Sequence, residues 1–432
     1  MKKIKLLMIG MLGMVLISCQ DLTEGFNDNP NAFTEVPSDL IIGQVELQAE
    51  MISNSTAART SGIFVDHFTG ADRQYVALNN YTTTAGDYDD LWERIYNLRA
   101  QSLIIQENST NLVIKGRAQM LEALAIGEAA ALWGDIPLTE ANKPTEFENP
   151  KYDSQAEVFK AVQALLDQSL TNVGNSVVQG SVMVINGASY AKIIHSLKAR
   201  YYLIVKDYAN ALKEAQLGIN VANGDQGLLV KHSATNNTEN LFWQFGIEQR
   251  AGYMTVVNSH WRKLLQGETP RALTTPGSAN IASILIDQDE LNYGNPNSLF
   301  AVNAPGIIID GIENAFIAIE ASHRLGQEST ARDLYNLLRQ ALEVRFGGEF
   351  PATSSSGTQL IKEILEEKYI LMPGSMQIFH DIRRTKNLIG VPIKNSSVSK
   401  IPQRFLYPQT EKNANKNFPG LVDLYEETPN NK

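Results

Sequence analysis

The sequence predicts a mainly α-helical protein in which about four stacked helix pairs support a loop-rich face. Two observations predict the scaffold. Apolar residues recur at helical spacing through much of the chain, and the windows 187–221 and 312–346 repeat one pattern of two helices joined by a short turn. A third observation predicts the face. The regions 64–88 and about 222–311 have the composition of loops, yet they keep many large aromatic residues.

The chain begins with a segment typical of a secretory signal. The basic stretch "MKKIK" precedes an uncharged apolar run from Leu6 to Ile17, which is shorter than the roughly 20 residues that cross a membrane. The run ends in "LISC", which resembles the bacterial lipobox, and its Cys19 is the single cysteine of the chain. We therefore predict that residues 1–18 are a signal peptide and that lipid on Cys19 anchors the protein to a membrane. The alternative is ordinary cleavage near this cysteine.

Charge and composition exclude several classes of protein. The formal net charge is −10 over 432 residues, and removal of residues 1–18 takes away three lysines and no acid. An acidic chain is not expected to bind nucleic acid, nor to add an electrostatic membrane contact to the lipid. A lipidated cysteine leaves no disulfide, and a chain of this length buries enough surface to fold without one. We expect residues 19–38 to be a lipidated N-terminus and tether, and residues 39–432 to form one helical-repeat domain with a loop-rich insertion at about 222–311.

Several helices are predicted in order along this domain. The window 117–133 is Ala-rich and apolar on all sides, which predicts a buried helix that stops at the Gly of "WGDIP". Two more helix pairs are expected at about 89–133. Ser154 and Glu157 form a capping-box pattern at the start of the amphipathic window 154–171.

The window 187–221 carries the pattern of a tetratricopeptide repeat. Its two helices are predicted to meet near Lys206, and the second opens with "DYANAL", the second-helix signature of that repeat. The window 312–346 repeats the arrangement with Gly326 between its helices. The scaffold is therefore predicted to be tetratricopeptide-repeat-like, and an irregular helical bundle is the alternative.

No signature of a common enzyme occurs in the sequence. The chain has no Gly-x-Gly-x-x-Gly, no P-loop, no His-Glu-x-x-His and no Gly-x-Ser-x-Gly. Glycosidases use two carboxylates, and Asp87, Asp89, Asp90 and Glu93 lie close together in sequence. Acids at the start of a helix also complement its positive end, and this interpretation is preferred. We expect no catalytic residue.

Neither a metal ion nor another cofactor is expected. The six histidines lack metal-ligand spacing. Asp287, Asp289 and Asn292 could ligate calcium, but the glycine that an EF-hand loop requires is missing, so structural calcium is unsupported.

The composition of the loops suits a sugar ligand. Flat aromatic side chains pack on the C–H faces of a sugar ring, and Asn, Asp, Gln and Arg bond its hydroxyls. The stretches "ADRQYVALNNY", "FWQFGIEQRAGY" and "NSHWRK" supply both kinds of side chain. The alternative is that these aromatics fill a core beneath the loops. The candidate ligand-binding residues are Asp72, Arg73, Tyr75, Asn80, Tyr81, Trp243, Tyr253, Trp261 and Arg262.

Five further stretches occur in the order and spacing of a known family. They are "FNDNPNAFTEV", "WGDIPLTEA", "PKYDSQAEVFKAVQALLDQS", "LEEKYILMPGSMQIFHDIRRT" and "IPQRFLYPQTEKNAN". Together they resemble the SusD/RagB family of Bacteroidetes outer-membrane lipoproteins, in its SusD-like nutrient-binding subgroup, over nearly the whole chain. These motifs belong to the scaffold, so the resemblance carries over no ligand-contacting residue.

The resemblance implies a fold and a function. The fold is a four-repeat helical scaffold beneath a loop-rich face. The function is non-catalytic binding of oligo- or polysaccharide at the cell surface, with delivery to a TonB-dependent, SusC-like barrel in the outer membrane. Two alternatives stay open: a helical-repeat lipoprotein that binds peptide or protein partners on its concave face, and a surface glycosidase.

Overall fold

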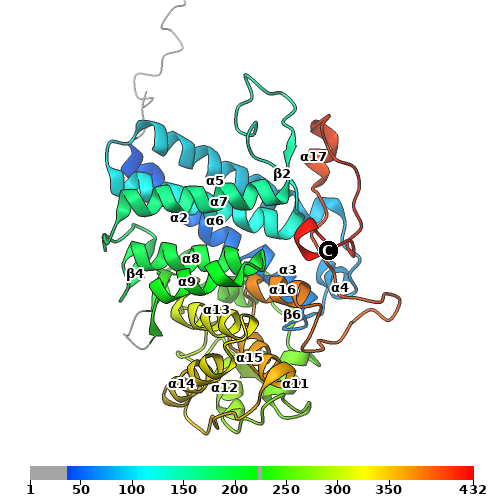
Figure 1. Cartoon of the computed structure of the whole chain (residues 1–432). Coiled ribbons are helices and arrows are strands. Elements are labelled where there is room, and N and C mark those ends of the chain that lie inside the picture. Colours follow the sequence, from blue (N-terminus) through cyan, green and yellow to red (C-terminus); the bar gives the residue numbers. More distant parts are fainter. Residues whose placement is uncertain (1–36, 222–225) are drawn as a thin grey trace, which may run out of the picture.

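The structure is a computed structural model that describes residues 37–221 and 226–432 (Figure 1). The predicted signal peptide, Cys19 and nearly all of the predicted tether lie outside the described residues. Within these two ranges helices dominate and the strands have two to five residues, which confirms the prediction of a mainly α-helical protein. No helix in the described ranges is long and apolar enough to cross a membrane.

Long helices form the first part of the scaffold, and α5, α6 and α7 lie side by side in Figure 1. The window 89–133 holds one pair of helices rather than the two pairs expected, because α5 and α6 run for 20 and 22 residues. Helix α7 begins at the predicted capping box, in which the Ser154 hydroxyl accepts from the Glu157 N–H. The helices are α2 (Ser38–Asn54), α3 (Thr56–Phe64), α5 (Asp89–Asn108), α6 (Leu112–Trp133) and α7 (Gln155–Val173).

Helix α6 is buried along nearly its whole length, as its Ala-rich composition predicts. It ends at Gly134, whose φ of 90° suits a residue without a Cβ. The last carbonyls of a helix lack partners within it and carry a partial negative charge. Here the carbonyl of Ala131 accepts from Arg383 (2.9 Å), and that of Trp133 accepts from Arg404.

Two helix pairs stand where the repeat pattern predicts them. They are α8 (Tyr190–Ile204) with α9 (Tyr208–Leu217), and α13 (Gly311–Arg324) with α14 (Glu328–Phe346). The backbone turns between the members of each pair at Lys206 (φ 63°) and Gly326 (φ 76°). Because α9 packs against α13, the two pairs stack on each other although about 90 residues separate them.

A three-stranded antiparallel sheet closes the loop-rich region. Its order is β4-β5-β9, and β5 and β9 stand at the beginning and end of the predicted insertion. The strands are β4 (Met183–Asn186), β5 (Gly227–Val230) and β9 (Gly306–Asp310). Between β5 and β9 lie α10 (Leu241–Trp243), η3 (Gln244–Gln249), β6 (Met254–Thr255), α11 (His260–Leu265), α12 (Ser278–Leu285), β7 (Ile286–Asp287) and β8 (Glu290–Leu291).

The remaining elements are short, apart from one helix near the C-terminus. Strands β2 and β3 form a two-stranded antiparallel sheet. In chain order these elements are β1 (Thr69–Gly70), α4 (Gln74–Asn79), η1 (Ala85–Tyr88), β2 (Ile136–Pro137), β3 (Tyr152–Asp153), α15 (Gly357–Leu371), α16 (Met376–Arg384), α17 (Gln409–Ala414) and η4 (Pro429–Asn431).

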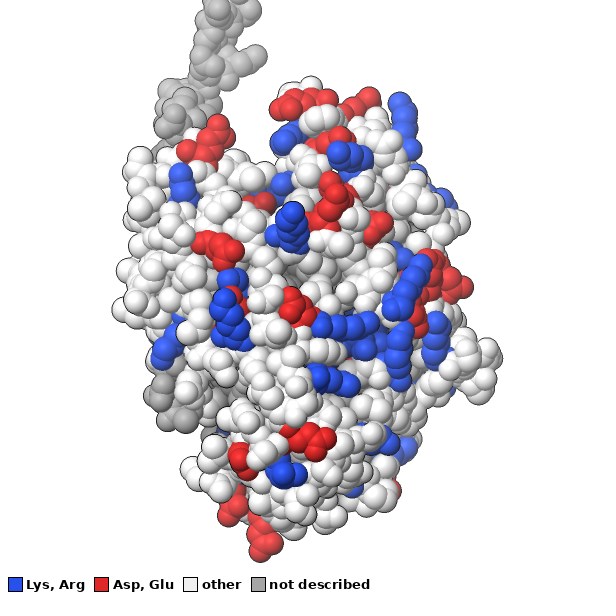
Figure 2. All heavy atoms as spheres, viewed as in Figure 1, with Lys and Arg blue, Asp and Glu red and all other residues white. Residues whose placement is uncertain are grey.

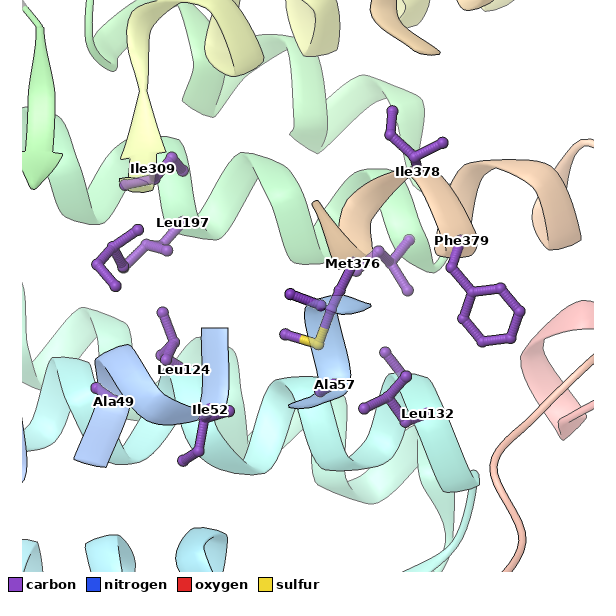
Figure 3. Packing of buried hydrophobic residues seen from close by; sticks show 14 of the residues in the cluster. Ala49, Ile52, Ala57, Leu124, Leu132, Leu197, Ile309, Met376, Ile378 and Phe379 are labelled. Atoms are coloured by element: carbon purple, nitrogen blue, oxygen red, sulfur yellow. The ribbon is translucent and has the colours of Figure 1, made fainter. Parts of the chain in front are cut away.

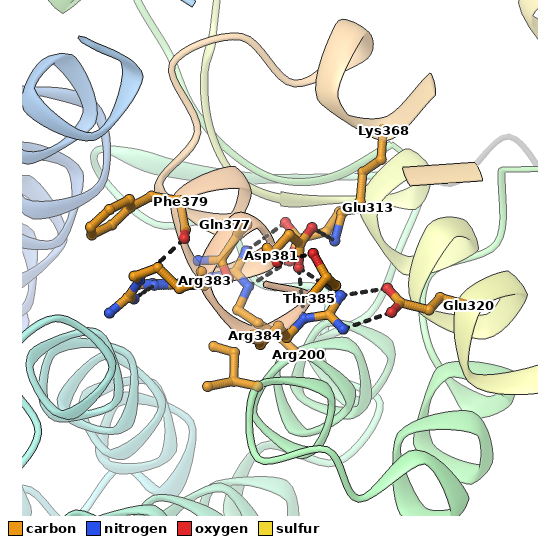
Figure 4. Close-up of polar contacts among 12 residues, drawn as sticks. Arg200, Glu313, Glu320, Lys368, Gln377, Phe379, Asp381, Arg383, Arg384 and Thr385 are labelled. Atoms are coloured by element: carbon orange, nitrogen blue, oxygen red, sulfur yellow. Dashed lines mark hydrogen bonds and ion pairs between the residues drawn. The ribbon is translucent and has the colours of Figure 1, made fainter. Parts of the chain in front are cut away.

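One large cluster of apolar side chains runs through the molecule. In Figure 3, Leu124 of α6, Leu197 of α8 and Met376 of α16 surround a shared interior, although they are far apart in the sequence. Several charged side chains in this interior form ion pairs with one another. Figure 4 shows Arg384 bound to Glu320 and Asp381. Burial alone would raise the pKa of Asp381, but Lys368 (2.7 Å) and Arg384 together hold that pKa below its usual value.

Candidate functional site

The two aromatic loop regions of the sequence meet in the structure. Strand β1 of the first region pairs antiparallel with β6 of the second, and the N–H of Ala71 donates to the carbonyl of Tyr253 (2.8 Å). A side chain at Gly70 would overlap the carbonyl of Tyr75, so the close approach of β1 to α4 requires glycine at this position. This pairing places α4 beside η3.

A cavity of about 350 Å³ lies at this junction, between α3, α4, η1 and η3. Three buried aromatic side chains form its floor: Tyr75 of α4, Tyr88 of η1 and Phe245 of η3. The ring centroids of Tyr75 and Phe245 are 5.0 Å apart, and the half-buried ring of Tyr253 lies 6.2 Å from Tyr75. We call this site the aromatic cavity.

Exposed polar side chains form the rim of the aromatic cavity. They are Gln74, Asp87, Gln249 and Arg250, which offer hydrogen-bond donors and acceptors above an apolar floor. Asp87 is the sole carboxylate among the described residues of the lining. The two facing carboxylates of a glycosidase are therefore not found in this cavity.

Arg59 of α3 is the one buried charge of the cavity lining, with 8% of its surface exposed. Its Nε donates to the Tyr75 hydroxyl (3.0 Å) and its Nη2 to the Thr56 hydroxyl (3.3 Å). Its guanidinium carbon lies 4.1 Å from the centroid of Phe245, which is a cation–π contact. The sequence patterns that mark the loops do not include Arg59, although one signal is present: the positions three and four residues away from it carry no acid that could pair with it.

The sequence of the chain matches one protein family. It matches the family model of SusD-like proteins, described as "Starch-binding associating with outer membrane", over residues 30–408. The chain belongs to this SusD-like family. Among curated proteins, no match was found.

Solved structures of SusD-like proteins share the fold at low sequence identity. A SusD/RagB family protein from Bacteroides thetaiotaomicron is 19% identical, with a TM-score of 0.63, over 89% of this chain and 95% of that one. A SusD homologue from Bacteroides fragilis is 18% identical, with a TM-score of 0.67, over 92% and 100% of the two chains. A chitin-binding protein is 20% identical, with a TM-score of 0.65, over 90% and 98%. These matches confirm the predicted tetratricopeptide-repeat-like scaffold.

The structure separates the candidate ligand-binding residues into three groups. Tyr75 belongs to the floor of the aromatic cavity, and Tyr253 packs beside it. Trp243 is half-buried and does not line the cavity. Asp72, Arg73 and Asn80 are exposed around α4 and lie outside the lining, so their contact with a ligand stays a prediction.

Two other candidates, Trp261 and Tyr81, occupy positions that differ from the expectation. Trp261 has no exposed surface, and its Nε1 donates to the carbonyl of Ile370 (3.0 Å), so this ring belongs to the core rather than to a binding face. Tyr81 is 4% exposed and its hydroxyl accepts from the N–H of Lys394 (3.3 Å), so it is also a core residue. An aromatic side chain with one polar atom is readily buried where the backbone satisfies that atom. Arg262 lies outside the cavity lining and pairs with Glu268 and Asp289, so its contact with a ligand stays a prediction.

The acids near the start of α5 have structural partners. The Asp87 carboxylate accepts from the N–H (2.7 Å) and the hydroxyl (3.0 Å) of Thr84, which completes a capping box. Asp89 accepts from the N–H of Thr410, and Asp90 pairs with Arg94 (2.9 Å) one turn along the helix. The preferred interpretation of these acids as helix-start residues is confirmed.

Two of the three residues considered as calcium ligands, Asp289 and Asn292, have other partners in the structure. Asp287 and Asp289 belong to the β7–β8 hairpin, where Asp289 lies 3.5 Å from Arg262, which also pairs with Glu268. The Asn292 side chain accepts from a backbone N–H instead. Across residues 37–221 and 226–432, no three His, Cys, Asp or Glu side chains come together as metal ligands.

A second, mostly apolar groove of about 550 Å³ runs between α7, the end of α8 and the C-terminal residues. Phe159, Tyr201 and Tyr202 line it, and so does Asn430, whose N–H donates to the Gln155 side chain (2.8 Å). The face drawn in Figure 2 mixes acidic and basic side chains, with Lys and Arg gathered towards its right side. If the helical scaffold binds a protein or peptide partner, the groove beside α7 is the expected contact site.

Proposed function

We propose that this SusD-like chain is a non-catalytic lipoprotein of the outer membrane that captures oligo- or polysaccharide at the cell surface. It then delivers the glycan to a TonB-dependent, SusC-like barrel. The observation that carries the proposal is the aromatic cavity, where an apolar floor of Tyr75, Tyr88 and Phe245 lies beneath an exposed polar rim. Lipid on Cys19 would hold the protein at the membrane, and residues 19–38 would tether it.

The arrangement of the cavity suits the two kinds of surface on a sugar. The C–H faces of the ring pack on aromatic side chains, and Gln74 and Gln249 at the rim bond the hydroxyls around it. The family description names starch, and one neighbour with the same fold is a chitin-binding protein, which supports a glycan as the ligand class. Because the rim is open to water and a glycan chain loses flexibility on binding, we expect modest affinity.

Affinity electrophoresis tests the proposal. The chain from Gln20 onward is run through native gels that contain single soluble polysaccharides, and retardation reports binding. We expect at least one glycan to retard the chain, and we expect Gln74→Ala and Gln249→Ala, which change two exposed residues of the cavity rim, to abolish this effect. Trp243→Ala is the matched control, because this half-buried ring lies outside the aromatic cavity. Retardation by no glycan, or retardation that only the control variant loses, contradicts the proposal.

The groove beside α7 supports the alternative function, binding of a peptide or protein partner. It is larger and more apolar than the aromatic cavity, as a groove for a peptide side chain would be. The discriminating variant is Tyr202→Ala, because this ring lines the groove and is only half-buried. If this variant no longer binds a peptide or protein partner that the wild type binds, and its glycan retardation is unchanged, the result favours peptide or protein binding as the function.

A further inference from the structure

Arg59 is a buried arginine without an acidic partner. It is 8% exposed, and no carboxylate of the described residues lies within ion-pair distance of its guanidinium. Most other buried arginines among the described residues pair with an acid, such as Arg99 with Glu122 (3.0 Å) and Arg200 with Glu313 (2.6 Å). A buried charge without compensation is costly, so a counter-charge is expected from outside the chain.

Two other buried arginines, Arg383 and Arg404, also have no acid in an ion pair, but their hydrogen-bond partners differ from those of Arg59. Arg383 and Arg404 donate to backbone carbonyls at the negative end of α6. The bonds of Arg59 go instead to two neutral hydroxyls, those of Tyr75 and Thr56, and neither lies at such a helix end. Arg59 also lines an open cavity, which leaves space for a ligand beside its charge.

The contacts of Arg59 hold its guanidinium in one orientation. Nε and Nη2 are bonded to hydroxyls, and the plane lies over the ring of Phe245 at 4.1 Å. Among the described residues, no acceptor binds its Nη1. A planar guanidinium fixed in this way presents N–H groups that suit two oxygens of one oxyanion.

The rest of the cavity lining adds positive charge. Arg250 on the rim donates to the carbonyl of its neighbour Gln249 (2.9 Å), and its exposed side chain has no acidic partner in the described ranges. The one acid of the lining, Asp87, is engaged by the N–H and hydroxyl of Thr84. Two cations therefore face one engaged acid, in a chain whose net charge is −10. The sign of the cavity is opposite to that of the protein.

We propose that the aromatic cavity selects glycans that carry an oxyanion on the sugar ring, either a uronate carboxylate or a sulfate ester. The oxyanion binds Arg59 and Arg250 while the ring packs on the aromatic floor. This inference rests on the proposed function and adds the ligand class to it. The shared chemistry is a negatively charged oxygen group, and the experiment separates its two sources.

Isothermal titration with matched ligands tests the proposal. Oligogalacturonate is compared with its methyl ester, which keeps the sugar and loses the charge, and chondroitin sulfate is compared with its desulfated form. Soluble starch and chitin oligosaccharides are the neutral probes. We expect one charged ligand to bind at least about tenfold more tightly than its matched partner, with a preference that weakens as salt is added. The pair that shows this preference identifies the source of the oxyanion.

Variants of the two cavity arginines test whether they cause the preference for the charged ligand. Arg59→Gln and Arg250→Gln are each expected to weaken binding of the charged ligand by about ten- to a hundredfold, the usual effect of losing a charged hydrogen bond. Binding of a neutral glycan should change little. Arg94→Gln is the matched control, because this arginine of α5 pairs with Asp90 outside the cavity. If Arg59→Gln does not fold, as judged by circular dichroism, the exposed Arg250→Gln decides the test.

The possible outcomes separate this inference from the proposed function. Equal affinity for charged and neutral glycans, lost on Gln249→Ala, overturns the inference and leaves the proposed function intact. A preference for charged ligands that neither arginine variant changes also overturns the inference. Binding of no glycan at all overturns the proposed function and the inference with it.

Discussion

His67, three residues after the end of α3, should make the protein less stable in mild acid. Its imidazole is fully buried, Nε2 donates to the carbonyl of Tyr369 (2.9 Å), and Nδ1 accepts from the N–H of Gly374 (3.2 Å). Both bonds together require the neutral ring with its proton on Nε2. Burial accordingly lowers the pKa of His67 to about 3.

The size of the effect follows from the two protonation equilibria. In the unfolded chain the same ring has a pKa of about 6.5. As the pH falls, the unfolded state therefore takes up the proton first, so the stability contributed by neutral His67 is complete above about pH 6.5 and is lost towards pH 3. Between pH 7 and pH 5, this linkage removes about 2 kcal/mol of the free energy of unfolding.

Urea denaturation at pH 5, 6 and 7 checks this value. His67→Gln keeps an N–H donor for the Tyr369 carbonyl but cannot titrate. We expect this variant to be less stable than the wild type at pH 7 and to lose about 2 kcal/mol less between pH 7 and pH 5. His260→Gln should reduce the loss of the free energy of unfolding between pH 7 and pH 5 by a similar amount, because burial lowers the pKa of His260 to about 4. If the wild type and His67→Gln show the same dependence on pH, the reasoning is refuted.

Three further predictions concern the core and the site. Trp261→Ala should lower the free energy of unfolding by roughly 3–5 kcal/mol in urea denaturation, because it empties a fully buried site; a loss below about 1 kcal/mol would contradict that position. Arg384→Ala leaves Glu320 buried without its main partner and should cost roughly 3–5 kcal/mol by the same assay, whereas Arg324→Ala, the more exposed partner of that acid, should cost much less. Similar losses in both arginine variants would refute the ranking. Gly70→Ala should clearly weaken glycan retardation and lower the melting temperature only slightly, because the added Cβ displaces α4 from β1. Unchanged retardation would show that this contact does not shape the cavity.

The sequence by itself determined the helical scaffold, because the signals for helices are local. The capping box at Ser154, the glycine stop at Gly134 and the turns at Lys206 and Gly326 each depend on residues a few positions apart, and all stand in the structure where the sequence predicts them. The motifs that resemble SusD/RagB proteins lie in this scaffold too, so the family could be recognised before the fold was known. The sequence did not determine how many helices residues 89–133 form, because a long helical window does not show where one helix ends and the next begins.

Only the tertiary structure decided which loop residues belong to a site. Trp261 and Tyr253 come from similar aromatic stretches, yet one is fully buried and the other lies half-exposed beside the cavity. Arg59 is on a helix, where the sequence analysis sought no ligand contact. Tyr75 and Phe245 meet because β1 pairs with β6, and that pairing joins backbones about 185 residues apart. Burial and proximity of this kind depend on contacts between distant segments, which no local pattern of residues records.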